Sequence, residues 1–182
     1  MERRQLLYAA PLAIAGIAGV SFLAMLGRMK TGAFDPHDVG SPMDGKKIPD
    51  FNLPALDGGS GFSSADVTAQ NRPILVNFFA SWCLPCVEEA PTMVALGAQL
   101  PIWGIAYKDK SPDTQRFLAR YGNPFQRLAA DADGFTAINF GVYGVPETYV
   151  IDKTGIIRAR YAGALTDDII ANRLLPLVRS LA

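Results

Sequence analysis

The chain has 182 residues, with 17 basic and 17 acidic side chains, so its formal net charge is zero. A nucleic-acid-binding protein usually carries a basic excess, and the balanced charge therefore argues against nucleic acid as a partner. The length, with 49% apolar residues, predicts one globular domain and an additional segment.

An uncharged run near the N terminus predicts a membrane anchor over residues 1–26. The run LLYAAPLAIAGIAGVSFLAML, residues 6–26, would span about 30 Å as a helix, roughly the hydrocarbon thickness of a bilayer. A cleaved signal peptide is one alternative, but its apolar region is shorter, and Ala13-Ile14-Ala15 falls too early for a cleavage site. A buried helix of a soluble domain is the other. Basic residues flank the run on both sides, so charge alone does not orient it.

The next segment, residues 27–46, is predicted to be a linker. It is rich in Gly, Pro, Asp and Lys and shows no sustained apolar period. The single histidine, His37, lies in this segment and is interpreted as solvated and without a role. Residues 47–182 are then expected to form the globular domain.

The first half of this domain predicts a buried strand followed by a helix. Residues 48–56 alternate in the manner of an edge strand or a hairpin arm. Residues 72–80, RPILVNFFA, form a continuous apolar run, which is typical of a central strand covered on both faces. A helix is expected over residues 83–96, with Pro85 in its first turn, where a missing N–H is tolerated. Pro91 should kink that helix.

The second half predicts further strands and helices. Residues 100–107 are expected to form a second buried strand, and residues 111–122 a helix with Ser111 as its N-cap. The remaining elements are a short helix within residues 133–142, two strands joined by an Asp-Lys-Thr-Gly turn over residues 147–163, and a final helix over residues 166–182 that Thr166 opens and that is interrupted near Pro176. This alternation predicts an α/β fold.

The two cysteines of the chain, Cys83 and Cys86, are spaced as CxxC and admit four interpretations. A zinc site needs about four ligands, and the histidine lies far away, so no metal is expected. A structural disulfide would close a very small loop and stabilise the fold little. Two inert buried thiols are a third possibility. A redox-active pair is favoured, because CxxC beside a βαβ pattern is a redox signal.

The helix start explains the chemistry expected of this pair. Its unpaired N–H groups and partial positive charge favour a thiolate over a thiol. Cys83 is then expected to be the more exposed, attacking cysteine. Cys86, one turn into the helix, is expected to be sheltered and to resolve the mixed disulfide. The flanking Trp82 and Pro85 strengthen this interpretation.

Several motifs carry a resemblance to a known family. The segment ILVNFFASWCLPC with the following Pro91 resembles the active-site strand, loop and helix of thioredoxin-fold proteins. The anchored N terminus and the motifs GIAYKD, GNPF and GVYGVPETYVIDKTGIIRARYAG are similar to the cytochrome c biogenesis thiol:disulfide interchange proteins, the CcmG or DsbE family. The resemblance covers about residues 47–182. It implies a thioredoxin-like fold, with a central mixed sheet flanked by helices and Pro146 in a cis peptide opposite the cysteines.

The resemblance also implies an activity and a location. Such proteins are held by a single membrane span on the periplasmic face of the bacterial inner membrane, and a membrane reductase keeps them reduced. They act as disulfide reductases without a soluble cofactor. Their expected partners are apocytochrome c, at its haem-attachment CxxCH, or a thiol protein of the same maturation pathway.

The resemblance further assigns roles to residues around the pair. Asn77 occupies the position of a buried acid in other thioredoxins, and Glu89 is the acid that the subgroup carries near the cysteines. The alternative for Glu89 is an ordinary solvated helix carboxylate. Substrate contacts are expected from Trp82, Val145, Pro146 and Glu147, the valine through its backbone by β-addition. Glu147 has an alternative too, as a residue that only begins a strand.

Two other functions are consistent with the same fold. A general thiol oxidant or peroxide-reducing protein would use the CxxC pair with the opposite redox poise, which the Leu84-Pro85 dipeptide alone does not determine. A chaperone that binds haem or apocytochrome would use the fold as a binding module, and its function would survive loss of both cysteines.

Overall fold

The computed structural model describes residues 3–30, 42–56 and 60–182, and within the first range it describes the side chains of residues 11 and 13–27. The chain divides into two compact units, Met1–Val39 and Gly40–Ala182. In the first unit, helix α1 spans Arg3–Lys30. Within the described part of the chain, no helix is both long and apolar enough to cross a membrane.

Two sequence predictions fall partly or wholly outside these residues. The uncharged run of residues 6–26 includes side chains that are not described, so the membrane anchor stays a prediction. His37 and most of the predicted linker lie outside the described residues.

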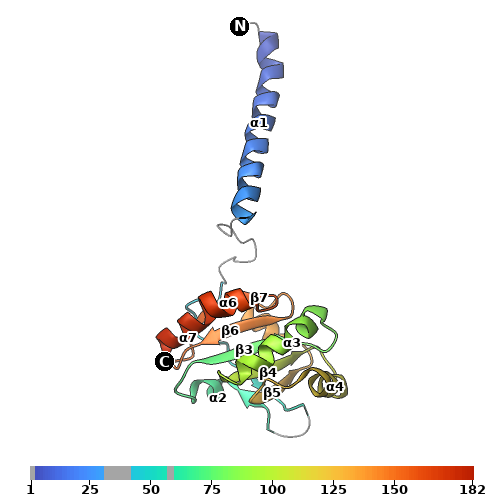
Figure 1. The fold of residues 1–182 in the computed structure, drawn as a ribbon, viewed down its shortest axis with the longest axis vertical. Coiled ribbons are helices and arrows are strands. Elements are labelled where there is room, and N and C mark those ends of the chain that lie inside the picture. Colours follow the sequence, from blue (N-terminus) through green and yellow to red (C-terminus); the bar gives the residue numbers. More distant parts are fainter. Residues whose placement is uncertain (1–2, 31–41, 57–59) are drawn as a thin grey trace. The chain divides into compact units, whose positions relative to one another are not determined.

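The second unit is built on a five-stranded mixed sheet with the strand order β5-β4-β3-β6-β7 (Figure 1). Strands β3, β4 and β5 are parallel, and β6 and β7 are antiparallel to their neighbours. The strands are β3 (Ile74–Phe79), β4 (Ile102–Tyr107), β5 (Arg127–Asp131), β6 (Glu147–Ile151) and β7 (Ile157–Ala162). This is the α/β architecture, with a central mixed sheet, that the resemblance implies.

Helices and a short hairpin cover the sheet. The hairpin pairs β1 (Asn52–Leu53) with β2 (Phe62–Ser63), which confirms the hairpin arm expected in residues 48–56. The helices are α2 (Ser64–Thr68), α3 (Leu84–Gly97), α4 (Ser111–Tyr121), α5 (Phe135–Phe140), α6 (Asp167–Ile169) and α7 (Leu175–Leu181), with a π-helical turn at Ile170–Leu174 before α7.

Strand β3 is buried along its whole length, as its apolar sequence predicts. Because strand side chains alternate between faces, Val76 and Phe78 pack on one side with the hairpin, α2 and α5. On the other side, Phe79 packs with α3 and α4, and Leu75 packs with α3 and the C-terminal helical segment. The strand therefore delivers its C-terminal end, and the cysteines that follow, to the edge of a rigid core.

The observed elements differ from the predicted ones in three places. Strand β5 and helix α2 were not predicted; β5 lies at the sheet edge, and its sequence RLAAD is only partly buried and lacks the apolar run of β3 and β4. The N-cap of α4 is Lys110 and not Ser111, because Lys110 has an extended backbone and its carbonyl accepts the Asp113 and Thr114 N–H groups at 2.9 and 3.0 Å. Helix α3 contains Pro91 in its interior, as the predicted helix over residues 83–96 does.

The end of the predicted linker belongs to the second unit. The Gly45 N–H donates to the Ile157 carbonyl at 2.8 Å, and the Ile157 N–H donates to the Lys46 carbonyl at 2.9 Å. These bonds place residues 45 and 46 beside β7, although the sequence suggests a domain that begins at residue 47.

Gly104 in β4 provides a test of this packing. A Cβ at Gly104 would lie 2.7 Å from Cγ of Phe125, whose ring stacks on Phe79 with centroids 4.6 Å apart and has little room to move. Gly104→Ala is expected to lower the free energy of unfolding by about 1–3 kcal/mol, measured by urea denaturation. Gly144→Ala is the control, since nothing lies within 4 Å of its Cβ position, and should change it by less than about 0.5 kcal/mol. Equal effects would contradict the packing argument.

Candidate active site

The two cysteines lie where β3 passes into α3, and they form a disulfide with their Cα atoms 5.3 Å apart. Cys83 is the N-cap of α3, and its Sγ accepts the Cys86 N–H at 3.1 Å. Pro85 sits in the first turn, where it removes an N–H that has no partner within the helix. The structure thus presents the oxidised form of the pair. In the reduced form the same N–H would stabilise a thiolate on Cys83.

Both cysteines are nearly buried. Cys83 is 4% exposed and Cys86 is 2% exposed, so the expected difference in exposure between them is small in the disulfide form. Their difference is instead positional, because Cys83 ends the loop before α3 and Cys86 lies within the helix. Trp82 is 60% exposed, and its indole N–H donates to the Lys108 carbonyl at 3.2 Å.

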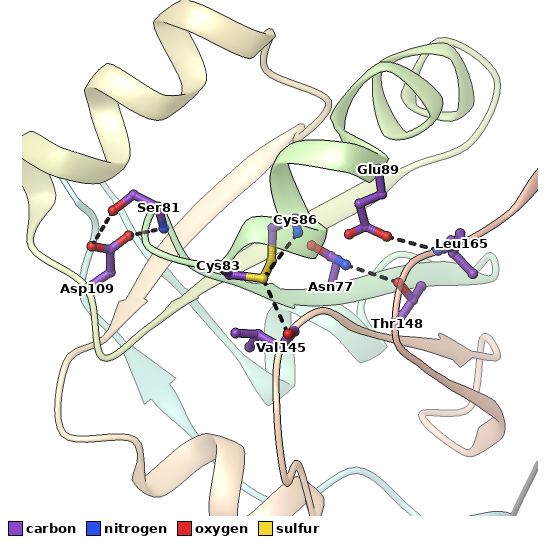
Figure 2. Close-up of a disulfide and its surroundings, with 9 residues drawn as sticks. All are labelled: Asn77, Ser81, Cys83, Cys86, Glu89, Asp109, Val145, Thr148 and Leu165. Carbon is purple, nitrogen blue, oxygen red and sulfur yellow. Dashed lines mark hydrogen bonds between the residues drawn. A yellow bond between two sulfur atoms is a disulfide. The ribbon is translucent and has the colours of Figure 1, made fainter. Parts of the chain in front are cut away.

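The loop before β6 lies against the disulfide. Its Val145–Pro146 peptide is cis, as the resemblance implies. The Val145 carbonyl oxygen is 3.3 Å from Cys83 Sγ and points toward it (Figure 2). Backbone polar groups of this loop are therefore presented beside the sulfur that begins the CxxC motif.

Glu147, directly after Pro146, is buried and fully engaged by protein groups. Its two carboxylate oxygens accept Arg160 Nε at 2.7 Å and Arg160 Nη2 at 2.9 Å. The Tyr143 N–H and the Tyr149 hydroxyl also donate to it. These bonds support the interpretation of Glu147 as a residue that fixes the start of β6 and the adjoining loop, and its predicted contact with substrate stays a prediction.

Glu89 lies on the other side of the disulfide and is 4% exposed, so the alternative of a solvated helix carboxylate is wrong. Burial raises its pKa from 4.5 to about 7, although hydrogen bonds from the Leu165 N–H and the Asn77 side chain favour the charged form. The Leu165 N–H donates to Glu89 Oε2 at 3.0 Å (Figure 2). A carboxyl with this pKa can take up or release a proton near neutrality.

Asn77 completes this buried polar group. Its side-chain amide donates to the Thr148 hydroxyl at 3.0 Å. A cavity of about 20 Å³, lined in part by Asn77, Cys86 and Glu89, lies beside the pair. A cavity of this size has room for one water molecule. The arrangement brings a titratable carboxyl and the second cysteine to one small cavity.

Two groups at this site were not predicted from the sequence. Asp109 accepts the Ser81 N–H at 2.6 Å and the Ser81 hydroxyl at 2.8 Å (Figure 2). Arg160 pairs with Glu147. One signal pointed to Asp109: it follows β4 as Ser81 follows β3, and the C-terminal ends of neighbouring parallel strands meet at one edge of a sheet.

A CxxC disulfide at the start of a helix, beside a cis-proline loop on a mixed sheet, defines a thiol:disulfide oxidoreductase of the thioredoxin-like fold. The AhpC/TSA family model matches residues 45–160. The chain therefore belongs to this family, and it is a thiol:disulfide interchange protein of the DsbE type, as its relatives indicate.

These relatives match along nearly the whole chain. The thiol:disulfide interchange protein HelX of Rhodobacter capsulatus is 36% identical, with 98% of each chain covered. The thiol:disulfide interchange protein DsbE of Escherichia coli is 38% identical and covers 97% of this chain and 95% of its own. Among solved structures, a thiol:disulfide interchange protein of the thioredoxin family from Chlorobium tepidum is similar with a TM-score of 0.59 and 25% identity, over 72% of this chain and 94% of the other.

The raised pKa of Glu89 predicts a pH dependence of stability. The folded protein binds the Glu89 proton more tightly than the unfolded chain does, so this stabilisation is complete below about pH 4.5 and is lost as the pH rises to about 7. The free energy of unfolding is expected to fall by about 3 kcal/mol over this pH range.

Glu89→Gln should remove this part of the pH dependence, measured by denaturant unfolding between pH 4.5 and 7.5. Glu88→Gln is the matched control, since Glu88 is the exposed neighbour on the same helix and should leave the profile unchanged. Superimposable profiles for wild type and Glu89→Gln would show that the buried carboxyl does not titrate in this range.

Proposed function

We propose that the protein is a disulfide reductase of cytochrome c maturation. Its substrate is the disulfide of an apocytochrome c CxxCH segment or of a thiol protein of the same pathway. One observation carries the proposal: the Cys83–Cys86 pair faces the Val145 backbone in a chain that matches DsbE-type proteins over nearly its full length. The motif GVYGVPET, which supports the resemblance to that family, forms the loop concerned.

The proposed reaction is a two-electron exchange between dithiol and disulfide. The Cys83 thiolate attacks one sulfur of the substrate disulfide, forming a mixed disulfide and releasing a substrate thiolate. The Cys86 thiolate then attacks Cys83 Sγ, which releases the second substrate thiolate and leaves the Cys83–Cys86 disulfide. The substrate gains two electrons and the enzyme loses two. A dithiol of a membrane reductase returns the pair to its reduced form.

Glu89 is proposed to accept the proton of the Cys86 thiol before the second step. Burial of both groups beside one cavity supports this role, as does a carboxyl pKa of about 7. Asn77 cannot act as a base, and it orients the site through its bond to Thr148. A water in the cavity can carry the proton between Cys86 and Glu89.

The backbone of Val145 is proposed to pair with an extended substrate segment, with Pro146 below it and Trp82 at the rim. The position of the Val145 carbonyl beside Cys83 supports this mode, because main-chain pairing would hold a substrate cysteine near the attacking sulfur. The exposed ring of Trp82 offers apolar contact area next to the pair. Glu147 is proposed to act by holding the loop through Arg160.

The location proposed is the bacterial inner membrane, with residues 1–26 as a single-pass anchor and the domain in the periplasm. The support is the uncharged run of residues 6–26 and the Cys83–Cys86 disulfide, since disulfides persist mainly in oxidising compartments outside the cytoplasm.

The division of labour between the cysteines is tested by trapping. Cys86→Ala should accumulate a dithiothreitol-sensitive adduct with a CxxCH-containing apocytochrome or a maturation protein, because it retains the nucleophile and cannot resolve the mixed disulfide. Non-reducing electrophoresis with mass spectrometry identifies the adduct. Cys83→Ala is the matched variant and should trap nothing. An adduct formed through Cys86 would reverse the assignment.

The redox poise separates the reductase from the oxidant alternative. A reductant is expected to have a potential near that of thioredoxin, about −270 mV, and far from that of the oxidant DsbA, about −120 mV. Equilibration with glutathione or dithiothreitol buffers measures it. A value above about −150 mV would exclude the proposed role.

The anchor is tested by fractionation. Alkaline phosphatase fused after Ala182 should be active and should sediment with the membranes, since the enzyme folds only outside the cytoplasm. A matched fusion to a chain that lacks residues 1–26 should be recovered without membranes. An inactive fusion would contradict the orientation, and a soluble full-length fusion would contradict the anchor.

A further inference from the structure

We propose that Asp109 is a positioning residue that holds the loop of residues 81–83 in the conformation that places Cys83 Sγ at the start of α3. The inference rests on the proposed role of Cys83 as the attacking cysteine. Asp109 lies in the loop after β4, across the disulfide from Glu89 and Asn77 (Figure 2).

The contacts of Asp109 join three segments of the domain. On the cysteine side, its Oδ2 accepts the Ser81 N–H at 2.6 Å and its Oδ1 accepts the Ser81 hydroxyl at 2.8 Å. On the helix side, Oδ1 accepts the Lys110 N–H and Oδ2 accepts the Thr114 hydroxyl, both at 2.8 Å. The carboxylate therefore fastens the loop after β3 to the first turn of α4.

A second bond runs in parallel. The Trp82 indole donates to the carbonyl of Lys108, the residue before Asp109. Lys108 has a positive φ of 45°, which is uncommon for a residue other than glycine. Two consecutive residues before Cys83 are thus tied to two consecutive residues after β4, and Cys83 follows with little freedom of its own.

The chemistry at this position requires a carboxylate. All four groups that face Asp109 are donors, and each carboxylate oxygen receives two of them. An asparagine has one acceptor oxygen, and its NH₂ group would face either the Ser81 N–H or the Lys110 N–H, neither of which can accept, although the two hydroxyls can. A carboxylate also makes stronger hydrogen bonds than a neutral acceptor. The substitution Asp109→Asn, although similar in shape, would break the loop side or the helix side of the network.

The consequence for Cys83 concerns its thiolate. Cys83 Sγ receives the Cys86 N–H only while Cys83 stays at the N-cap of α3. A loop released from Asp109 would let the sulfur leave this donor, and the thiol would titrate at higher pH. The charge of Asp109 acts in the opposite sense, because a nearby negative charge disfavours a thiolate. Lys108 and Lys110 flank it with positive charge. Loss of the positioning effect would raise the pH at which the Cys83 thiol titrates, whereas loss of the Asp109 charge alone would lower it.

The test is the pH midpoint for alkylation of Cys83 by iodoacetamide in the reduced full-length protein, with the modified cysteine identified by mass spectrometry. The midpoint reports the thiolate, whereas the limiting rate at high pH reports access to the sulfur. Asp109→Ala and Asp109→Asn are expected to raise the midpoint by up to about one pH unit, which is a tenfold loss of thiolate at fixed pH below the midpoint. A lowered midpoint would show that the charge of Asp109 outweighs its positioning effect, and an unchanged midpoint would show that positioning does not dominate the stability of the thiolate; either result overturns the proposal.

Matched variants separate the two sides of the network. Ser81→Ala removes a loop-side donor and should raise the midpoint less, in the same direction. Thr114→Val removes a helix-side donor and should lower the melting temperature without moving the midpoint. Asp113→Ala removes a charge from the same helix, from a side chain that is 39% exposed and pairs with Arg116, and should change neither. If Asp109→Ala does not fold, the alkylation midpoints of Ser81→Ala and Thr114→Val are compared instead. Equal midpoints for these two variants would contradict the proposal.

Alkylation needs no protein substrate. Reduction of a CxxCH peptide disulfide by the wild type is therefore measured separately. Its failure would count against the proposed role in cytochrome c maturation and would leave the result for Asp109 as measured.

Discussion

The bond from the Cys86 N–H to Cys83 Sγ is the interaction on which the site depends. It exists because β3, buried on both faces, leads through a short loop to Cys83 at the N-cap of α3, so that a sulfur takes the place of an N-cap oxygen. The Val145 carbonyl oxygen, from the loop before β6, lies 3.3 Å from the same sulfur. A small displacement of the loop would remove a donor from the sulfur, and the bonds of Ser81 to Asp109 and of Trp82 to Lys108 restrict such a displacement.

Three carboxylates near the disulfide differ in their partners. Glu147 is paired with Arg160 and is satisfied by donors on both oxygens. Asp109 receives four donors and remains half-buried. Glu89 is buried and receives hydrogen bonds from the Leu165 N–H and the Asn77 side chain, which do not offset its loss of solvation, so burial raises its pKa to about 7. The paired and saturated carboxylates suit a structural task, whereas the one that burial makes weakly acidic suits proton transfer.

Much of the fold follows from local sequence patterns. The apolar run of β3, the proline in the first turn of α3 and the Asp-Lys-Thr-Gly turn before β7 each act over a few residues, and the structure contains each element. Strand β5 was missed because an edge strand with one partner needs no apolar run, and RLAAD carries no local signal for it. The cap of α4 was predicted one residue too late, because serine is a typical N-cap residue whereas Lys110, the observed N-cap, makes no side-chain capping bond.

The sequence by itself determined the reactive pair and its place at a strand-to-helix junction, because CxxC, the strand and the helix start are contiguous. Only the tertiary structure decided which carboxyl is buried beside the pair and which groups hold the loop. Glu89 has the same helical spacing whether or not it is solvated, and only the folded chain shows that it is buried and accepts the N–H of Leu165, 76 residues away. Ser81 meets Asp109 across 28 residues. Contacts at such separations depend on how strands and helices pack, and no pattern within one segment encodes them.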